Sequence, residues 1–97
     1  MKNLLLAFSF LATMTVTAFS QGKAVTGTVT AAEDGQALPG VTVVEKGTQN
    51  ATFTDLDGRY TLTVAGEEAT LIFSFIGYTP QSLAVGAKAE INASLSA

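Results

Sequence analysis

The sequence predicts an all-β domain, a seven-stranded antiparallel β-sandwich of two sheets. Three observations lead to this prediction. The nine glycines all follow residue 21 and, from Gly27 onward, divide the chain at intervals of five to eleven residues, as turns between short strands do. The segments between them alternate apolar and polar side chains, which is the period of a strand with one buried face. No segment after residue 20 has the periodicity of an amphipathic helix.

The first four strands are expected at residues 25–31, 40–47, 50–55 and 59–64. In the first strand, apolar or small residues fall on the odd positions, and threonines occupy positions 26, 28 and 30. The fourth strand alternates in the same way, with Tyr60, Leu62 and Val64 on its apolar face. Threonine suits the outer face of such strands because its branched side chain fits the pleat while its hydroxyl faces water.

The last three strands are expected at residues 69–75, 77–85 and 90–95. Segment 69–75, ATLIFSF, is almost continuously apolar, which favours a position in the middle of a sheet. Pro80 has no N–H to give to a ladder, so the strand around it is expected at an edge or a bulge. Ile91, Ala93 and Leu95 alternate with polar residues and complete the set.

Residues 1–20 have the composition of a secretory signal peptide. Lys2 supplies the positive start, an uncharged stretch follows from residue 4 to 19, and Ala18 and Ser20 are the small residues that a signal peptidase recognises. Cleavage is expected before Gln21, which leaves one domain at residues 21–97. The alternative is a membrane anchor, but serine and threonine dilute the stretch and no stop-transfer charges follow it. We therefore expect an exported protein with no direct membrane insertion after cleavage.

Composition excludes most functional classes. The sequence holds no histidine and no cysteine, so the usual nucleophile–base pairs and thiolate or imidazole metal sites cannot form. We predict that the protein is not an enzyme, has no catalytic residue and needs no cofactor. Acidic side chains outnumber basic ones, eight to five, which argues against nucleic acid as a partner, since such binding needs clustered Lys and Arg.

The motif TDLDGRY at residues 54–60 has two interpretations. Asp55, Asp57 and Gly58 resemble part of a calcium loop, but the Glu that should close such a loop is missing. The favoured interpretation is a tight turn, in which a carboxylate accepts backbone N–H bonds and Gly58 supplies a positive φ. Pro39 and Gly40 are expected to fix a second bend.

The motif FIGYTP at residues 75–80 groups Phe75, Ile76 and Tyr78 around a glycine. Packing against the core is the favoured interpretation of these side chains. The alternative is an exposed surface that contacts a protein partner or stacks against a sugar ring.

Taken in order, the motifs LPGVTV (38–43), KGT (46–48), TDLDGRYTL (54–62) and FSFIGY (73–78) closely resemble the carboxypeptidase-regulatory-like (CarboxypepD_reg-like) domain. The version at the N-terminus of SusC/RagA-type TonB-dependent outer-membrane receptors of Bacteroidota is especially similar. The resemblance covers residue 25 to about residue 95. It implies a Greek-key sandwich of the transthyretin-like, also called prealbumin-like, type that has no catalytic activity.

The resemblance also implies a place in the cell envelope of a Gram-negative bacterium, in the periplasm or associated with the outer membrane. We expect an accessory interaction module, linked to TonB-dependent nutrient uptake, that contacts an envelope protein. Because no length remains for a plug and a barrel, the chain is expected to be either a free-standing copy of the module or the truncated front end of a receptor. A carbohydrate-binding module is the alternative function.

Overall fold

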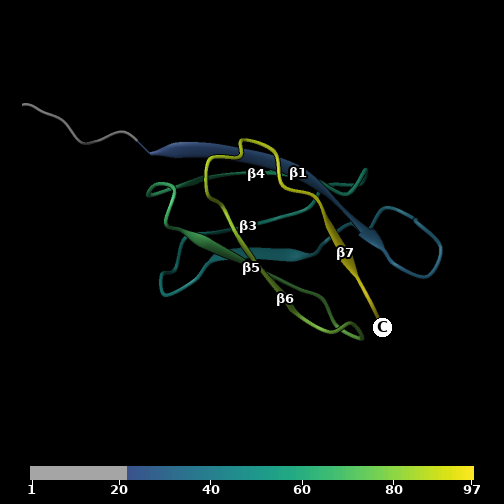
Figure 1. The fold of residues 1–97 in the computed structure, drawn as a ribbon. Coiled ribbons are helices and arrows are strands. Elements are labelled where there is room, and N and C mark those ends of the chain that lie inside the picture. Colours follow the sequence, from purple (N-terminus) through teal and green to yellow (C-terminus); the bar gives the residue numbers. More distant parts are fainter. Residues whose placement is uncertain (1–21) are drawn as a thin grey trace, which may run out of the picture.

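The computed structural model describes residues 22–97, so the expected signal peptide at residues 1–20 lies outside the described residues. Within that range the structure is all-β and contains no helix, and therefore none that could cross a membrane. The predicted all-β fold with seven strands is confirmed (Figure 1). The strands are β1 (Lys23–Ala31), β2 (Thr42–Glu45), β3 (Ala51–Phe53), β4 (Arg59–Val64), β5 (Thr70–Ser74), β6 (Gln81–Ala84) and β7 (Ala93–Leu95).

The strands form two sheets, with the orders β4-β1-β7 and β3-β2-β5-β6. Four of the five strand pairings are antiparallel, but β7 lies parallel to β1, so the prediction of an entirely antiparallel sandwich is wrong for this pair. The connection from β6 causes the exception. It reaches β1 first at Thr26, which bonds the backbone of Ala89 and Ile91, and then continues in the same direction as β1 into β7.

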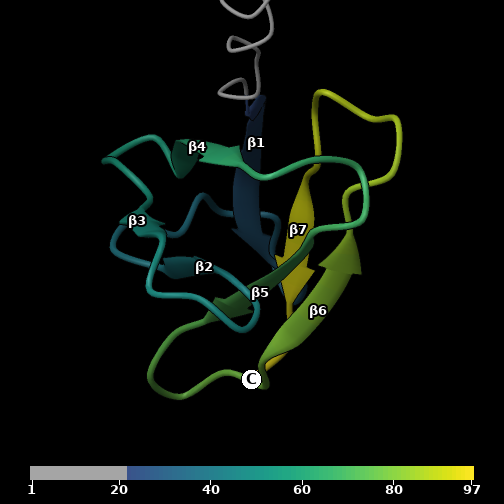
Figure 2. The ribbon, with the colours of Figure 1, turned by 90° about the vertical axis from the view of Figure 1, so that its left-hand side faces the viewer.

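The region between β5 and β6 also differs from the expected strand at residues 77–85. A turn closed by the bond from the Tyr78 N–H to the Phe75 carbonyl (3.0 Å) interrupts the strand pattern, and β6 begins only at Gln81, after Pro80. The two predictions about position are confirmed. β5 lies inside its sheet between β2 and β6, and β6 is an edge strand (Figure 2).

The core lies between the two sheets, and Tyr60 shows how closely they pack. Its ring meets that of Phe73, on β5, edge-on with centroids 5.5 Å apart, and its hydroxyl donates to the carbonyl of Ile91 at 2.7 Å. Gly27 makes room for this contact, since a Cβ there would lie 1.8 Å from the Ile91 oxygen. Burial, with a smaller effect of the Glu90 charge, raises the pKa of Tyr60 to about 12.

Candidate functional site

Asp55 organises the TDLDGRY turn between β3 and β4. Its Oδ1 accepts from the N–H of Asp57 at 2.9 Å and from that of Arg59 at 3.0 Å. Its N–H donates to the Arg59 carbonyl, and its carbonyl accepts from the Gly58 N–H, both at 2.9 Å. The N–H bonds from Arg59 and Asp57 hold the pKa of this carboxyl below its ordinary value of 3.8, because they favour the charged form. Asp57 contributes to this network through its backbone.

Gly58 has a packing role as well as a conformational one. Its φ is +76°, a value that residues with a Cβ adopt only at a cost. The residue is also buried, and a Cβ there would lie 2.8 Å from the carbonyl oxygen of Val29 and 3.0 Å from the Cβ of Ala37. The turn therefore packs directly against β1. A glycine is required at position 58 both for the backbone conformation and because a side chain has no room there.

Thr54 fixes the second bend, and the sequence reasoning missed it. Its Oγ1 donates to the Leu38 carbonyl at 2.6 Å and accepts from the Val41 N–H at 2.9 Å. The Gly40 N–H in turn donates to the Thr54 carbonyl at 3.0 Å, and Pro39 stands exposed at the bend before Gly40, whose φ is +79°. The motifs LPGV and TDLDGR are thus one unit, joined by a buried hydroxyl. Thr54 follows Thr52 by two residues, so the alternation of the strand places both on the inward face. This alternation was the feature of the sequence that could have indicated the buried position of Thr54.

Glu45 is the second residue that the sequence reasoning missed. Its side chain is 8% exposed. One carboxylate oxygen accepts from the Asn50 side-chain amide at 3.0 Å, and the other accepts from the Ala65 N–H at 3.2 Å. The same amide of Asn50 donates to the Thr63 carbonyl, so this cluster joins the β2–β3 hairpin to the end of β4. Both carboxylate oxygens of Glu45 and the side-chain nitrogen of Asn50 therefore bond to other parts of the fold, which is a structural arrangement.

The carboxylates do not come together as a metal site. Among residues 22–97, no group of three or more His, Cys, Asp or Glu side chains is placed to hold a metal ion. The calcium alternative for Asp55 and Asp57 therefore has no third carboxylate ligand in that part of the chain, although calcium takes six to eight oxygens.

The structure separates the members of the FIGYTP group. Phe75 and Tyr78 are partly buried and pack against the core, with ring centroids 5.8 Å apart and planes tilted by 35°. Ile76 points the other way and is 92% exposed. It borders an open groove of about 410 Å³. The groove is lined by Gly40, Thr42, Ser74, Phe75 and Ile76.

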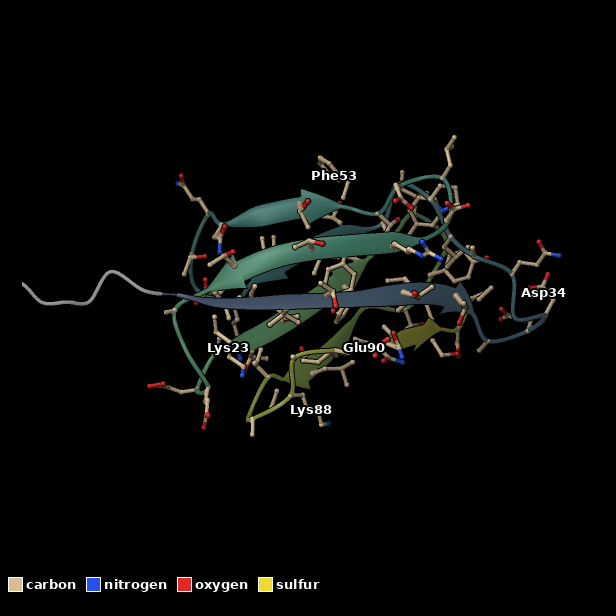
Figure 3. All side chains as sticks on the ribbon, turned by 90° about the horizontal axis from the view of Figure 1, so that it is seen from above. Lys23, Asp34, Phe53, Lys88 and Glu90 are labelled. Carbon is tan, nitrogen blue, oxygen red and sulfur yellow. The ribbon has the colours of Figure 1, made fainter. Side chains whose placement is uncertain are left out.

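The outer face of the four-stranded sheet carries no charged side chain over its strands. Register and burial place the alternate residues of β3, β2, β5 and β6 on this face, and Phe53, 65% exposed, stands on its β3 side (Figure 3). The residues are Thr42, Val44, Ala51, Phe53, Thr70, Ile72, Ser74, Ser82 and Ala84.

Comparison with known families and proteins agrees with the resemblance seen in the sequence. The profile of the CarboxypepD_reg-like domain matches residues 25–97. A TonB-dependent receptor from Formosa agariphila is 40% identical to the chain over 94 residues, which is 97% of this chain and 9% of the receptor. The TonB-dependent receptor SusC of Bacteroides thetaiotaomicron is 44% identical over 52 residues, 54% of this chain and 5% of SusC. The chain thus spans less than a tenth of these relatives.

A solved structure supports the fold alone. A chain from a type II cohesin–X-dockerin complex of Acetivibrio cellulolyticus superposes with a TM-score of 0.57 at 23% sequence identity. The similarity covers 75% of this chain and 53% of that one.

Proposed function

Because the chain belongs to the CarboxypepD_reg-like domain family, we propose that it is an exported, non-catalytic interaction module that contacts a protein of the bacterial cell envelope in connection with TonB-dependent uptake. The observation that carries the proposal is the similarity to a TonB-dependent receptor along 97% of the chain. The absence of histidine and cysteine from the sequence supports a role without catalysis. The uncharged outer face offers a surface for a partner.

The proposal includes export, with residues 1–20 removed as a signal peptide and residues 21–97 kept as the domain. Mass spectrometry of protein purified from a periplasmic fraction tests this part. An N-terminus at Gln21 is the expected result, and a product that retains Lys2 would contradict it.

We also propose the prealbumin-like Greek-key connectivity for the sandwich. The chain passes between the two sheets after β1, β3, β4 and β6, which supports a crossed arrangement over a simple meander. An experimental structure with consecutive strands paired throughout would contradict it.

The partner is tested by photo-crosslinking in living cells. A photoreactive amino acid replaces Phe53 on the uncharged outer face, or Ile76 in the turn that follows β5, and Thr28 on the opposite sheet serves as the control position. Crosslinks to one envelope protein from the first two positions are expected. If all three positions give the same faint, unselective pattern, the domain is not an interaction module.

A glycan ligand is the weaker alternative. Sugar binding to aromatic residues needs an exposed ring face, whereas Phe75 and Tyr78 lean on the core. A glycan array probed with the wild-type protein and with Tyr78→Ala separates the alternatives. A sugar that binds the wild-type protein and does not bind Tyr78→Ala would favour carbohydrate binding.

A further inference from the structure

The two sheets end in four edge strands, β4 and β7 in one sheet and β3 and β6 in the other. An edge strand exposes a row of backbone N–H and C=O groups that can pair with another extended chain. In an antiparallel ladder these groups alternate, so every second residue of an edge strand directs them away from its neighbour. What each edge meets in the structure decides whether it can accept a further strand.

The gap between β3 and β4 is bridged at both ends. At one end, the N–H of Asp55 donates to the carbonyl of Arg59 at 2.9 Å, and the Asp55 carboxylate accepts from the Arg59 N–H at 3.0 Å. At the other end, the side-chain amide of Asn50 donates to the carbonyl of Thr63 at 2.6 Å. A partner strand cannot run along either edge without breaking one of these bridges.

The edge of β7 is occupied by residues at and just before the start of β6. The carbonyl of Ser94 accepts from the side-chain amide of Gln81, and the carbonyl of Ser96 accepts from the N–H of Thr79, both at 2.7 Å. These bonds tie the end of the chain to the beginning of β6. Beyond them β6 and β7 diverge, as Figures 1 and 2 show from two directions.

The remainder of β6 is open. The bond from the Val85 N–H to the Ala69 carbonyl (3.0 Å) continues the ladder with β5, so alternation directs the backbone groups of Ser82 and Ala84 away from β5. Both residues are exposed, and within residues 22–97 no hydrogen bond occupies these backbone groups. Strand β6, QSLA, also lacks the charged side chains that usually protect an edge.

We propose that the outer edge of β6 accepts an extended, uncharged strand of a partner protein, which pairs with the backbone of Ser82 and Ala84. This inference rests on the proposed interaction function and names its surface. The strand residues of the outer face that the added strand would extend carry no charge, so an uncharged partner strand matches them. On the inner side it would cover Leu83, which is partly buried against the core, so an apolar residue fits that position.

The probe is an uncharged heptapeptide of alternating threonine and valine, added to 15N-labelled protein and followed by NMR. We expect saturable shifts at the amides of Ser82 and Ala84, slower exchange of these two amides with solvent, and a dissociation constant of roughly 1 mM, because a single added strand makes few contacts. The same peptide, N-methylated on one hydrogen-bonding edge, is expected to bind about tenfold more weakly or not at all. This second peptide tests the backbone bonds without altering the protein.

A matched pair of variants tests the location. Ala84→Pro removes an N–H that β5 does not use, so it should preserve the sheet and weaken peptide binding about tenfold. Ala51→Pro makes the same change at the outward position of β3 and should leave binding unchanged. Equal binding by wild type and Ala84→Pro, or shifts that map to β3 or β4, would overturn the proposal. Shifts at Ser82 that depend on protein concentration without peptide would assign the edge to a second copy of this chain and overturn it too.

The crosslinking experiment separates this inference from the proposed function. If Ala84→Pro binds no peptide yet keeps the envelope crosslink, the domain is an interaction module that uses another surface, and the edge proposal fails. If the peptide binds at β6 while no envelope protein is ever crosslinked, the backbone edge of β6 accepts an added strand but the proposed interaction function fails.

Discussion

Two turns of this domain share a glycine with the same backbone requirement and differ in how they pack. The turn at residues 54–60 and the turn at residues 75–78 each contain a glycine with positive φ, +76° at Gly58 and +91° at Gly77. At Gly58 a Cβ would meet the backbone of β1, whereas nothing lies within 4 Å of the same position at Gly77. The glycine of the first turn is therefore packed against another strand, and that of the second lies open at the surface.

Replacing the two glycines by alanine gives the largest expected effect. Gly58→Ala combines unfavourable φ with a clash against the Val29 carbonyl, so we expect it to lower the free energy of unfolding by about 3 kcal/mol, or roughly 15 °C in thermal midpoint. Gly77→Ala meets only the φ penalty, about 1 kcal/mol. Urea and thermal unfolding measure both. Equal losses of unfolding free energy in the two variants would show that the cost at both positions comes from backbone conformation alone and that Gly58→Ala causes no clash.

The hydroxyl of Thr54 gives the next largest effect. Thr54→Val keeps the shape but leaves the Leu38 carbonyl and the Val41 N–H without their partner, so we expect a loss of about 2 kcal/mol. Thr63→Val, at an exposed position of β4, is the control and should change stability by less than about 0.5 kcal/mol. If the two valine variants unfold at the same urea concentration, the joint between the two bends does not depend on this hydroxyl.

The charge of Asp55 produces a smaller effect that depends on pH. The folded state holds the pKa of Asp55 below 3.8, so the charged carboxylate stabilises the fold above that pH, and the contribution disappears as pH falls through the folded-state pKa. Asp55→Asn should therefore be less stable than wild type at pH 7, and the difference should shrink on acidification. Denaturant unfolding at a series of pH values measures it. A difference that stays constant across the series would assign the effect to geometry instead of charge.

Calcium gives the smallest expected effect, which is none. Because the part of the chain that the structure describes brings no third acidic ligand to Asp55 and Asp57, millimolar calcium should leave the thermal midpoint unchanged. A rise of several degrees would indicate binding to the folded state and would make the first turn a ligand site.

The sequence predicts the positions of the strands more accurately than the contacts and connections between them. Alternation locates β1 and β4 almost to the residue, because one buried face imposes a period of two. The parallel direction of β7 depends on the path of the connection before it, which no local pattern records. Thr54 and Glu45 were missed for a related reason. Polar residues in alternating strands suggest a solvent-facing position, and although the alternation places Thr54 on the inward face, the folded chain is needed to identify the partners. Those of Thr54 lie 13 and 16 residues away, and those of Glu45 lie 5 and 20 residues away.

The contact between Tyr60 and Phe73 has a practical consequence for spectroscopy. The protein has two tyrosines and no tryptophan, so its intrinsic fluorescence comes from tyrosine, and one of the two emitters lies at the junction of both sheets. Separation of the sheets would break the contact between the Tyr60 and Phe73 rings, whereas Tyr78 reports on the turn before β6. Spectra of Tyr78→Phe would isolate the Tyr60 signal, so that the opening of the sandwich could be followed without attaching a dye.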